Sequence, residues 1–347
     1  MTIEEYCYSF HSCIIVCSDI ERSPLFRKIL TFPSGNLIYV LPAVIIVALI
    51  TGYFIDTEPL KSIILPVIIY AIYPSMIGFR LQELKEMHEK KLLLFNLLFN
   101  LFIVPLAAYT AASVFLQQNP EMFTGLVIIS VVPGGTMIIA FTMIFNGNVK
   151  AAIKLTTLSL ITGSSLAPVY LYFIVGKYVP VDIISVFKNI AIVVFLPMLM
   201  GILTYRALMK KFTMDEFNAR IRPLLPGFSS WGLVYIIFTS ISLKSHMIIA
   251  YPGLLVKGLT ALLLFYILIY VIVIITARKL FSEKDGITLL LSLVLRNLAI
   301  SIGLAAAAFG PQTTMMVALA FLIQQQSAVW FASLNKKYGF LRKYGEI

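Results

Sequence analysis

The sequence predicts an all-α polytopic membrane protein, and three observations support this fold class. Of the 347 residues, 60% are hydrophobic and only 12% are charged, and the mean hydropathy is +0.94. The hydrophobic residues gather in ten segments, each long enough or nearly long enough to cross a bilayer. The basic residues behind the net charge of +11 lie mostly between these segments, so a membrane surface is the expected partner and nucleic acid is not.

The ten expected transmembrane spans follow one another with short links. We expect them at residues 36–54, 62–79, 92–115, 122–145, 151–175, 183–205, 229–248, 254–277, 286–309 and 313–334. They divide the chain into an N-terminal tail (1–32), a first five-span unit (33–178), a second five-span unit (179–335) and a C-terminal tail (336–347).

The distribution of Lys and Arg predicts the orientation. Both tails and every second link between them carry most of the basic residues, which predicts a multi-pass plasma-membrane protein with both termini in the cytoplasm. The first residues include Glu4 and Glu5 and no basic stretch, so we expect no cleaved signal peptide. Cys7, Cys13 and Cys17 all lie in the N-terminal tail, and we expect them to be reduced thiols rather than a metal site.

The two five-span units resemble each other in sequence. Residues 133–155 overlay residues 297–319 at an offset of 164, which pairs Phe145 with Phe309 and Leu155 with Leu319. A repeat with an odd number of spans places its second copy upside down in the membrane. We therefore expect two inverted repeats.

The fourth and ninth expected spans contain residues that interrupt a helix. Pro133, Gly134 and Gly135 stand inside the fourth, where Pro removes a backbone donor and each Gly weakens a helix by about 1 kcal/mol. The matching place in the ninth span holds Arg296 and Asn297. Taken alone, the Pro-Gly-Gly motif has a plain kink as its alternative, and Arg296 has a charge at the end of a span as its alternative. Their matched positions instead predict two broken helices that cross near the membrane midplane and bind a solute.

Three patches of sequence resemble one superfamily. Residues 131–159, with Pro-Gly-Gly-Thr followed by Gly-Asn-Val, resemble the bile-acid/sodium symporters. Residues 71–84 resemble the second span of the arsenical-resistance (arsenite) permeases, and residues 296–310 resemble the ninth span of both groups. The resemblance covers about residues 33–335. It implies that the fourth and ninth helices unwind and cross in a core domain, against which a panel domain moves.

The chain departs from both groups at the positions that bind their ions. The resemblance implies an arsenite-binding Cys at the position of Gly134 and a Glu at the position of Ala299. It implies sodium ligands at five positions where this chain has other residues, namely Ile138, Ile139, Ala152, Ser292 and Arg296. We therefore expect no sodium at the usual first site.

Basic residues near this site are candidates for a built-in cation that replaces sodium. They are Arg296 and the pair Lys150 and Lys154, which are four residues apart on one helix face. The alternative for the two lysines is that they extend to the membrane surface. A fixed cation predicts uniport, exchange or proton coupling instead of sodium symport.

Helix N-termini at the two breaks favour negative charge, so a small organic anion is the preferred solute, while a neutral solute stays open. The candidate solute-binding residues are Asn96, Asn100, Pro133, Gly134, Gly135, Thr136, Thr156, Ser159, Arg296 and Asn297. For the two asparagines in the third span, a hydrogen bond between helices is an equal alternative. The same ambiguity holds for residues 324–326, three consecutive glutamines.

The sequence thus predicts a secondary transporter that works by alternating access. Arsenite or metalloid efflux is the first alternative and a non-transporting membrane sensor is the second. We find no HExxH, G-x-S-x-G or P-loop motif, so neither an enzyme nor a cofactor is expected.

Overall fold

The computed structural model describes residues 24–341 apart from 79–88, 136, 178–182 and 251. Thr136 and the three cysteines of the predicted tail lie outside the described residues. The described part of the chain is helical and contains no strand. Eight of its helices are long and apolar enough to cross a membrane, or nine if the bent pair Leu25–Gly35 and Tyr39–Phe54 counts as one span. An all-helical membrane protein is confirmed, whereas ten spans in two inverted repeats stay a prediction.

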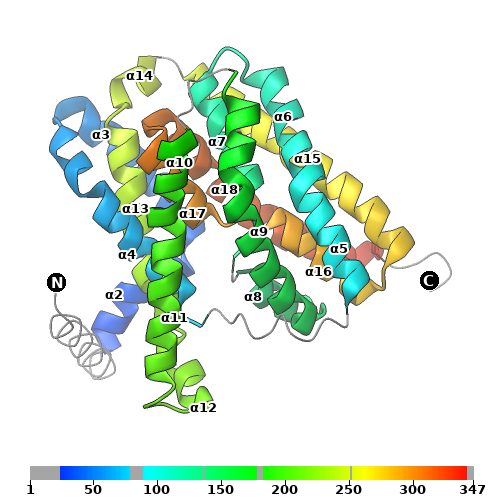
Figure 1. Ribbon diagram of the computed structural model, residues 1–347. Helices are drawn as coiled ribbons and strands as arrows, with labels where there is room; N and C mark the ends of the chain where they lie inside the picture. The colour runs from blue at the N-terminus through cyan, green and yellow to red at the C-terminus, as the bar shows by residue number, and fades with distance from the viewer. Residues whose placement is uncertain (1–23, 79–88, 136, 178–182, 251, 342–347) are drawn as a thin grey trace.

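The helices form two groups that pack side by side (Figure 1). In the first group, α13 packs on α2, α3 and α4, and α11 packs on α4. Its helices are α2 (Pro24–Gly35), α3 (Leu37–Phe54), α4 (Ile64–Met76), α10 (Ile183–Ile190), α11 (Leu196–Leu208), α13 (Leu225–Ser242) and α14 (Ser245–Ala250), with the short α12 (Met214–Glu216) after α11. The second group contains α5 (Lys90–Leu98), α6 (Val104–Phe115), α7 (Pro120–Val131), α8 (Met137–Ile144), α9 (Val149–Val175), α15 (Gly253–Leu280), α16 (Glu283–Val294), α17 (Leu298–Ala308) and α18 (Pro311–Tyr338).

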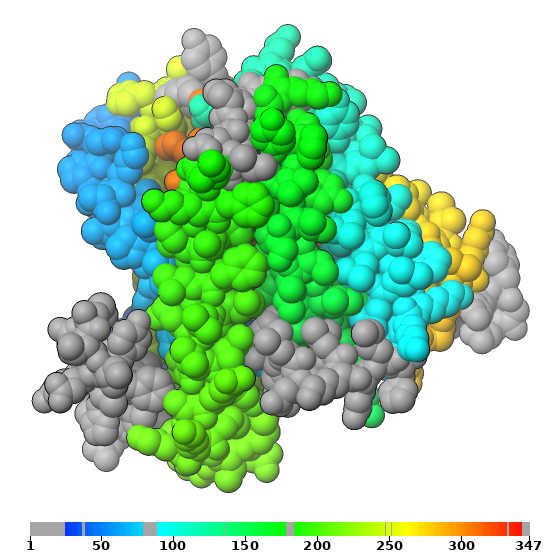
Figure 2. All heavy atoms as spheres, viewed as in Figure 1, coloured from blue at the N-terminus to red at the C-terminus, as the bar shows by residue number. Residues whose placement is uncertain are grey.

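The groups meet along α17, which touches α4, α10 and α13, along α18, which touches α3 and α13, and where α9 touches α10. On α17, Gly303 is essential to the close approach, because a Cβ at this position would lie 2.8 Å from Ile68 Cγ2 and 3.2 Å from Val193 Cγ1. The green helices α9, α10 and α11 fill the middle of the visible face between the blue and cyan elements (Figure 2).

Both segments that contain helix-interrupting residues are broken, as predicted. The fourth divides into α7 and α8, with residues 132–135 outside helices. The ninth divides into α16 and α17, with Leu295, Arg296 and Asn297 between them. Asn297 is the N-cap of α17, where its Oδ1 accepts from the Ile300 amide at 3.2 Å, so the second half of the segment begins at a residue suited to starting a helix.

Two parts of the structure differ from the sequence-based boundaries. Residues 24–32, which we expected in the tail, belong to the helix α2 (Pro24–Gly35). The seventh expected span, 229–248, is instead α13 from Leu225 to Ser242, followed by the separate α14. The earlier start follows from Pro226 in the first turn of α13. Proline lacks a backbone N–H, and N–H groups in the first turn have no acceptor within the helix, so Pro226 costs no hydrogen bond there.

Candidate functional site

The two breaks lie against each other in the core of the second group. The backbone N–H of Asn297 donates to the carbonyl oxygen of Pro133 at 3.2 Å. A Cβ added to Gly134 would lie 2.3 Å from the Leu295 carbonyl oxygen, and one added to Gly135 would lie 2.8 Å from Asn297 Nδ2. Glycine is therefore needed at position 134 for the two backbones to cross so closely, whereas at position 135 it leaves room for the Asn297 side chain.

The buried guanidinium of Arg296 connects the second break to the end of α7. The side chain is only 3% exposed. Its Nε donates to the Ile129 carbonyl oxygen at 3.1 Å, and its Nη2 donates to the Ser130 carbonyl oxygen. Both carbonyls belong to the last turn of α7, where the helix offers them no partner and where the helix dipole favours a cation. Arg296 therefore caps α7 from the opposite break.

The main chain of Arg296 is held by a side chain of α18. Its N–H donates to Gln324 Oε1 at 2.9 Å, and Gln324 Nε2 donates back to the Arg296 carbonyl oxygen at 3.0 Å. The hydroxyl of Tyr266 in α15 also donates to Gln324 Oε1, at 3.1 Å. Since unwound backbone at membrane depth has no water to bind, these bonds satisfy groups that the break leaves without helical partners.

The polar side chains of the third span form a buried network beside Arg296. Asn96 Nδ2 donates to Ser159 Oγ at 2.6 Å, and Ser292 Oγ donates to Asn96 Oδ1 at 2.7 Å. Asn100 donates to the Asn96 carbonyl oxygen at 2.9 Å, while its own Oδ1 accepts from Arg296 Nη1. Three helices and the break are thus linked by hydrogen bonds, and the amide groups of both asparagines are engaged with protein atoms.

Comparison with known proteins identifies the family. Residues 65–251, more than half of the chain, match the model of the Sodium Bile acid symporter family. The chain belongs to the sodium bile acid symporter family. The matched region includes the α7–α8 break and ends before the α16–α17 break.

This member of the bile acid symporter family is also similar to individual proteins, some of which are named as cotransporters. The uncharacterized protein YbaS of Bacillus subtilis (strain 168) is 21% identical over 280 residues, which are 78% of this chain and 87% of YbaS. The probable sodium/metabolite cotransporter BASS2, chloroplastic, of Oryza sativa subsp. japonica is 32% identical over 123 residues, 35% of this chain. The probable sodium/metabolite cotransporter BASS1, chloroplastic, of Arabidopsis thaliana is 28% identical over 99 residues, 28% of this chain. The chain spans about a quarter of the length of these two cotransporters. Together, family and relatives support a membrane transporter of small solutes.

The remaining candidate residues of this bile acid symporter homologue are Thr156, Lys154 and Lys150, and each has a different environment. Thr156 is buried and its hydroxyl donates to the Ala152 carbonyl oxygen within α9. The Lys154 ammonium lies 2.9 Å from Glu89 Oε2, so a carboxylate balances its charge. Lys150 is exposed. Within the described residues, neither lysine is hydrogen-bonded to the Arg296 network.

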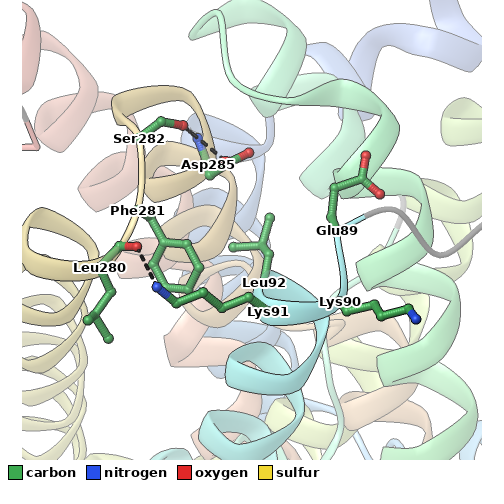
Figure 3. Close-up of a pocket in the computed structure, with 8 residues that line it drawn as sticks. All are labelled: Glu89, Lys90, Lys91, Leu92, Leu280, Phe281, Ser282 and Asp285. Carbon is green, nitrogen blue, oxygen red and sulfur yellow. Dashed lines mark hydrogen bonds between the residues drawn. The ribbon is translucent and has the colours of Figure 1, made fainter.

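A cavity of about 320 Å³ lies away from the crossing, where α15 ends and α5 and α16 begin, on the side predicted to be cytoplasmic. Figure 3 shows Lys91 extended across the Phe281 ring, with its Nζ 3.0 Å from the Leu280 carbonyl oxygen, whereas Lys90 points the other way.

In this family member, sequence reasoning missed one contributor to the crossing, Tyr266, and left a second, Gln324, undecided among its neighbours. Tyr266 has no distinguishing signal, because it is one of many aromatic residues in apolar segments. Gln324 was one of three consecutive glutamines, and the sequence could not decide which of them faces the break. The structure selects Gln324, which is buried, while residues 325 and 326 are partly exposed.

Proposed function

We propose that this protein is a secondary transporter that carries a small organic anion across the plasma membrane by alternating access, without the sodium sites usual in its relatives. The observation that carries the proposal is the buried guanidinium of Arg296 at the crossing of the two breaks, bonded to neutral oxygen atoms only.

An anionic solute is favoured by the charge balance of the crossing. The acceptors of Arg296 are two backbone carbonyls and the amide oxygen of Asn100, and none is a carboxylate. A buried cation without an ionised partner is costly, and a bound anion would supply the missing charge. The N-termini of α8 and α17 at the breaks add to the same preference. Asn297, which is partly exposed beside Gly135, offers an amide N–H₂ group to the solute, with Thr136 as a further candidate.

The same contacts support transport without sodium. Carbonyl oxygens at the C-terminal ends of broken helices are typical ligands of coupling cations in secondary transporters. Here the carbonyl oxygens of Ile129 and Ser130 accept from Arg296 instead. We propose that the guanidinium takes the place of a coupling cation, which leaves uniport, exchange or proton coupling. The name of the BASS relatives includes sodium, so this is a difference in mechanism from what their names state.

We further propose ten spans in two inverted repeats, with both termini in the cytoplasm. Adding 164 to the bounds of α7 gives 284–295, and α16 spans Glu283–Val294. The same shift takes α9 to 313–339, close to α18 at Pro311–Tyr338. It takes the helical segment 90–115 to 254–279, close to α15 at Gly253–Leu280. In this architecture the group with the breaks is the core, and the group around α13 is the panel that rocks against it.

The experiment that tests the proposal uses the purified full chain. A thermal-shift screen of small organic anions first finds a ligand, because a solute that binds the folded state raises the melting temperature. Uptake of that ligand is then measured in proteoliposomes with sodium or with potassium as the external cation. We expect saturable uptake that is equal in the two salts. Uptake that requires a sodium gradient would contradict the fixed-cation mechanism, and binding without any flux would indicate a sensor.

Arsenite efflux receives no support from the site. Arsenic(III) binds most tightly to thiolates, and the three cysteines of the chain all lie within residues 7–17, outside the expected spans.

A further inference from the structure

The short helix α2 is nearly perpendicular to α3, the helix that follows it. The axes of Leu25–Gly35 and Tyr39–Phe54 differ by 86°. Since α3 coincides with the first expected span, a helix at this angle runs close to the plane of the membrane surface. At 12 residues, α2 is also too short to span the bilayer itself.

One face of α2 is apolar and uncovered by the described protein. Leu25, Ile29 and Phe32 are 69%, 52% and 57% exposed, and their spacing of four and three residues places them on one stripe of the helix. The polar face carries Arg27 and Lys28, both exposed. An apolar stripe beside a basic face is the pattern of helices that lie in the interface of a bilayer.

The helix is fixed to the first group of helices, so its orientation is set by the fold. Leu30 is buried against Leu224 and Phe228 at the start of α13. A Cβ on Gly227 would lie 2.8 Å from the Leu30 carbonyl oxygen, which shows how closely the two helices approach. Trp231 Nε1 donates to the Ile29 carbonyl oxygen at 3.3 Å. Trp231 is itself 41% exposed, and tryptophan is enriched at the level of lipid headgroups.

Positive charge is concentrated at this end of the molecule. Arg222 lies two residues before Leu224, the residue that contacts α2, and is exposed like Arg27 and Lys28. The orientation expected from the sequence places this end at the cytoplasmic leaflet, where anionic lipids attract basic segments.

We propose that α2 is an interfacial helix that inserts Leu25, Ile29 and Phe32 among the lipid chains and binds anionic lipid headgroups through Arg27 and Lys28. It would fix the height of α13 relative to the membrane, because Leu30 and the Trp231–Ile29 hydrogen bond tie the two helices together. Lipid binding by α2 does not depend on the identity of the transported solute.

The insertion of α2 is tested by the depth of labelled positions. The full chain, with Cys7, Cys13 and Cys17 changed to Ser, carries Ile29→Cys or Thr31→Cys labelled with a fluorophore and is placed in nanodiscs. We expect lipids with a nitroxide near the headgroup to quench the label at position 29, and iodide in water to quench the label at position 31. Iodide quenching at position 29 as strong as that at position 31 would overturn the proposal, since the apolar face of α2 would then lie in water.

The headgroup preference is tested by counting bound lipids. Phosphatidylglycerol or phosphatidylcholine is titrated into the purified full chain, and the bound lipid is measured by native mass spectrometry. For Arg27→Gln and Lys28→Gln we expect about fivefold weaker phosphatidylglycerol binding for each charge removed. The control is Lys61→Gln, because Lys61 is exposed near the start of α4, on the side predicted to be outside. Unchanged phosphatidylglycerol binding in the two α2 variants, or an equal loss in Lys61→Gln, would overturn the assignment.

Discussion

Arg296 donates a hydrogen bond from its guanidinium to the carbonyl oxygen of Ser130. The two residues are far apart in sequence and belong to the two broken segments, so each break completes the other. Arg296 provides the cation that the C-terminus of α7 favours, and α7 provides acceptors that a buried arginine requires. The crossing is therefore stabilised by polar contacts between breaks in addition to apolar packing.

Removing the guanidinium should destabilise the fold strongly. Arg296→Ala leaves the carbonyls of Ile129 and Ser130 and the amide oxygen of Asn100 without their donors. Each buried group left unsatisfied costs about 1–3 kcal/mol. We expect a much lower melting temperature and a low yield of folded protein, measured by thermal shift in detergent. A melting temperature equal to that of the wild type would mean that the Arg296 contacts are not formed in the folded protein.

Arg296→Gln tests whether the guanidinium replaces a cation. Gln keeps a polar side chain but carries no charge. Without the guanidinium, the carbonyl oxygens of Ile129 and Ser130 are free to bind a metal ion. We expect sodium chloride, compared with potassium chloride, to raise the melting temperature of Arg296→Gln and to leave the wild type unchanged. A sodium-dependent rise in the wild type would contradict the prediction that the chain lacks a sodium site.

The glycines of the first break should respond unequally to a single methyl group. In Gly134→Ala the new Cβ would lie 2.3 Å from the rigid carbonyl of Leu295, so we expect the crossing to separate and transport to be lost. In Gly135→Ala the nearest atom is the side-chain amide of Asn297, at 2.8 Å, which can move. We expect that variant to fold but to bind solute more weakly, with a raised KM. Gly253→Ala is the matched control, because nothing lies within 4 Å of a Cβ there.

The break in the fourth segment was predictable because Pro133, Gly134 and Gly135 act on the backbone locally. The partners of Arg296 were not predictable, because they are main-chain carbonyls and every residue has one. The choice of Gln324 over its neighbours depends on the rotation of α18, which the packing of the whole bundle decides. Most of α2 falls within the predicted tail (1–32), although its apolar spacing at Leu25, Ile29 and Phe32 is visible in the sequence.

The support of the second break by Gln324 should be measurable. Tyr266→Phe removes one hydrogen bond to Gln324 and should cost about 0.5–1.5 kcal/mol. Gln324→Leu removes both bonds to the main chain of Arg296 and should cost more. Unfolding free energies of the two single variants and the double variant form a cycle. We expect the loss of stability in the double variant to be smaller than the sum of the losses in the two single variants. Strict additivity would show that the two residues act independently.

Lys154 and Glu89 allow a test between two roles for the lysine. If Lys154 balances Glu89, Lys154→Gln should lower stability and leave the KM for solute unchanged. If Lys154 is a built-in cation for the solute, the same variant should raise the KM. We expect the first outcome, in which Lys154→Gln lowers stability and leaves the KM unchanged. Glu89→Gln should lower stability by a similar amount, because either change leaves one member of a largely buried pair without its partner. Lys150→Gln is the control, since Lys150 is exposed on the same helix.

A larger residue at position 303 should slow transport without preventing binding. Gly303 lies where α17 of the second group meets α4 of the first group, and a Cβ there would lie 2.8 Å from Ile68 Cγ2 and 3.1 Å from Ile72 Cδ1. Because these contacts join the two groups rather than the two breaks, Gly303→Val should leave the crossing intact and impede the rocking of one group on the other. We expect the thermal shift caused by the solute to be retained and the maximal uptake rate to fall, with Gly303→Ala showing a smaller decrease. A full uptake rate in Gly303→Val would mean that this contact does not change during transport, and the moving surface would then have to lie elsewhere, such as between α9 and α10.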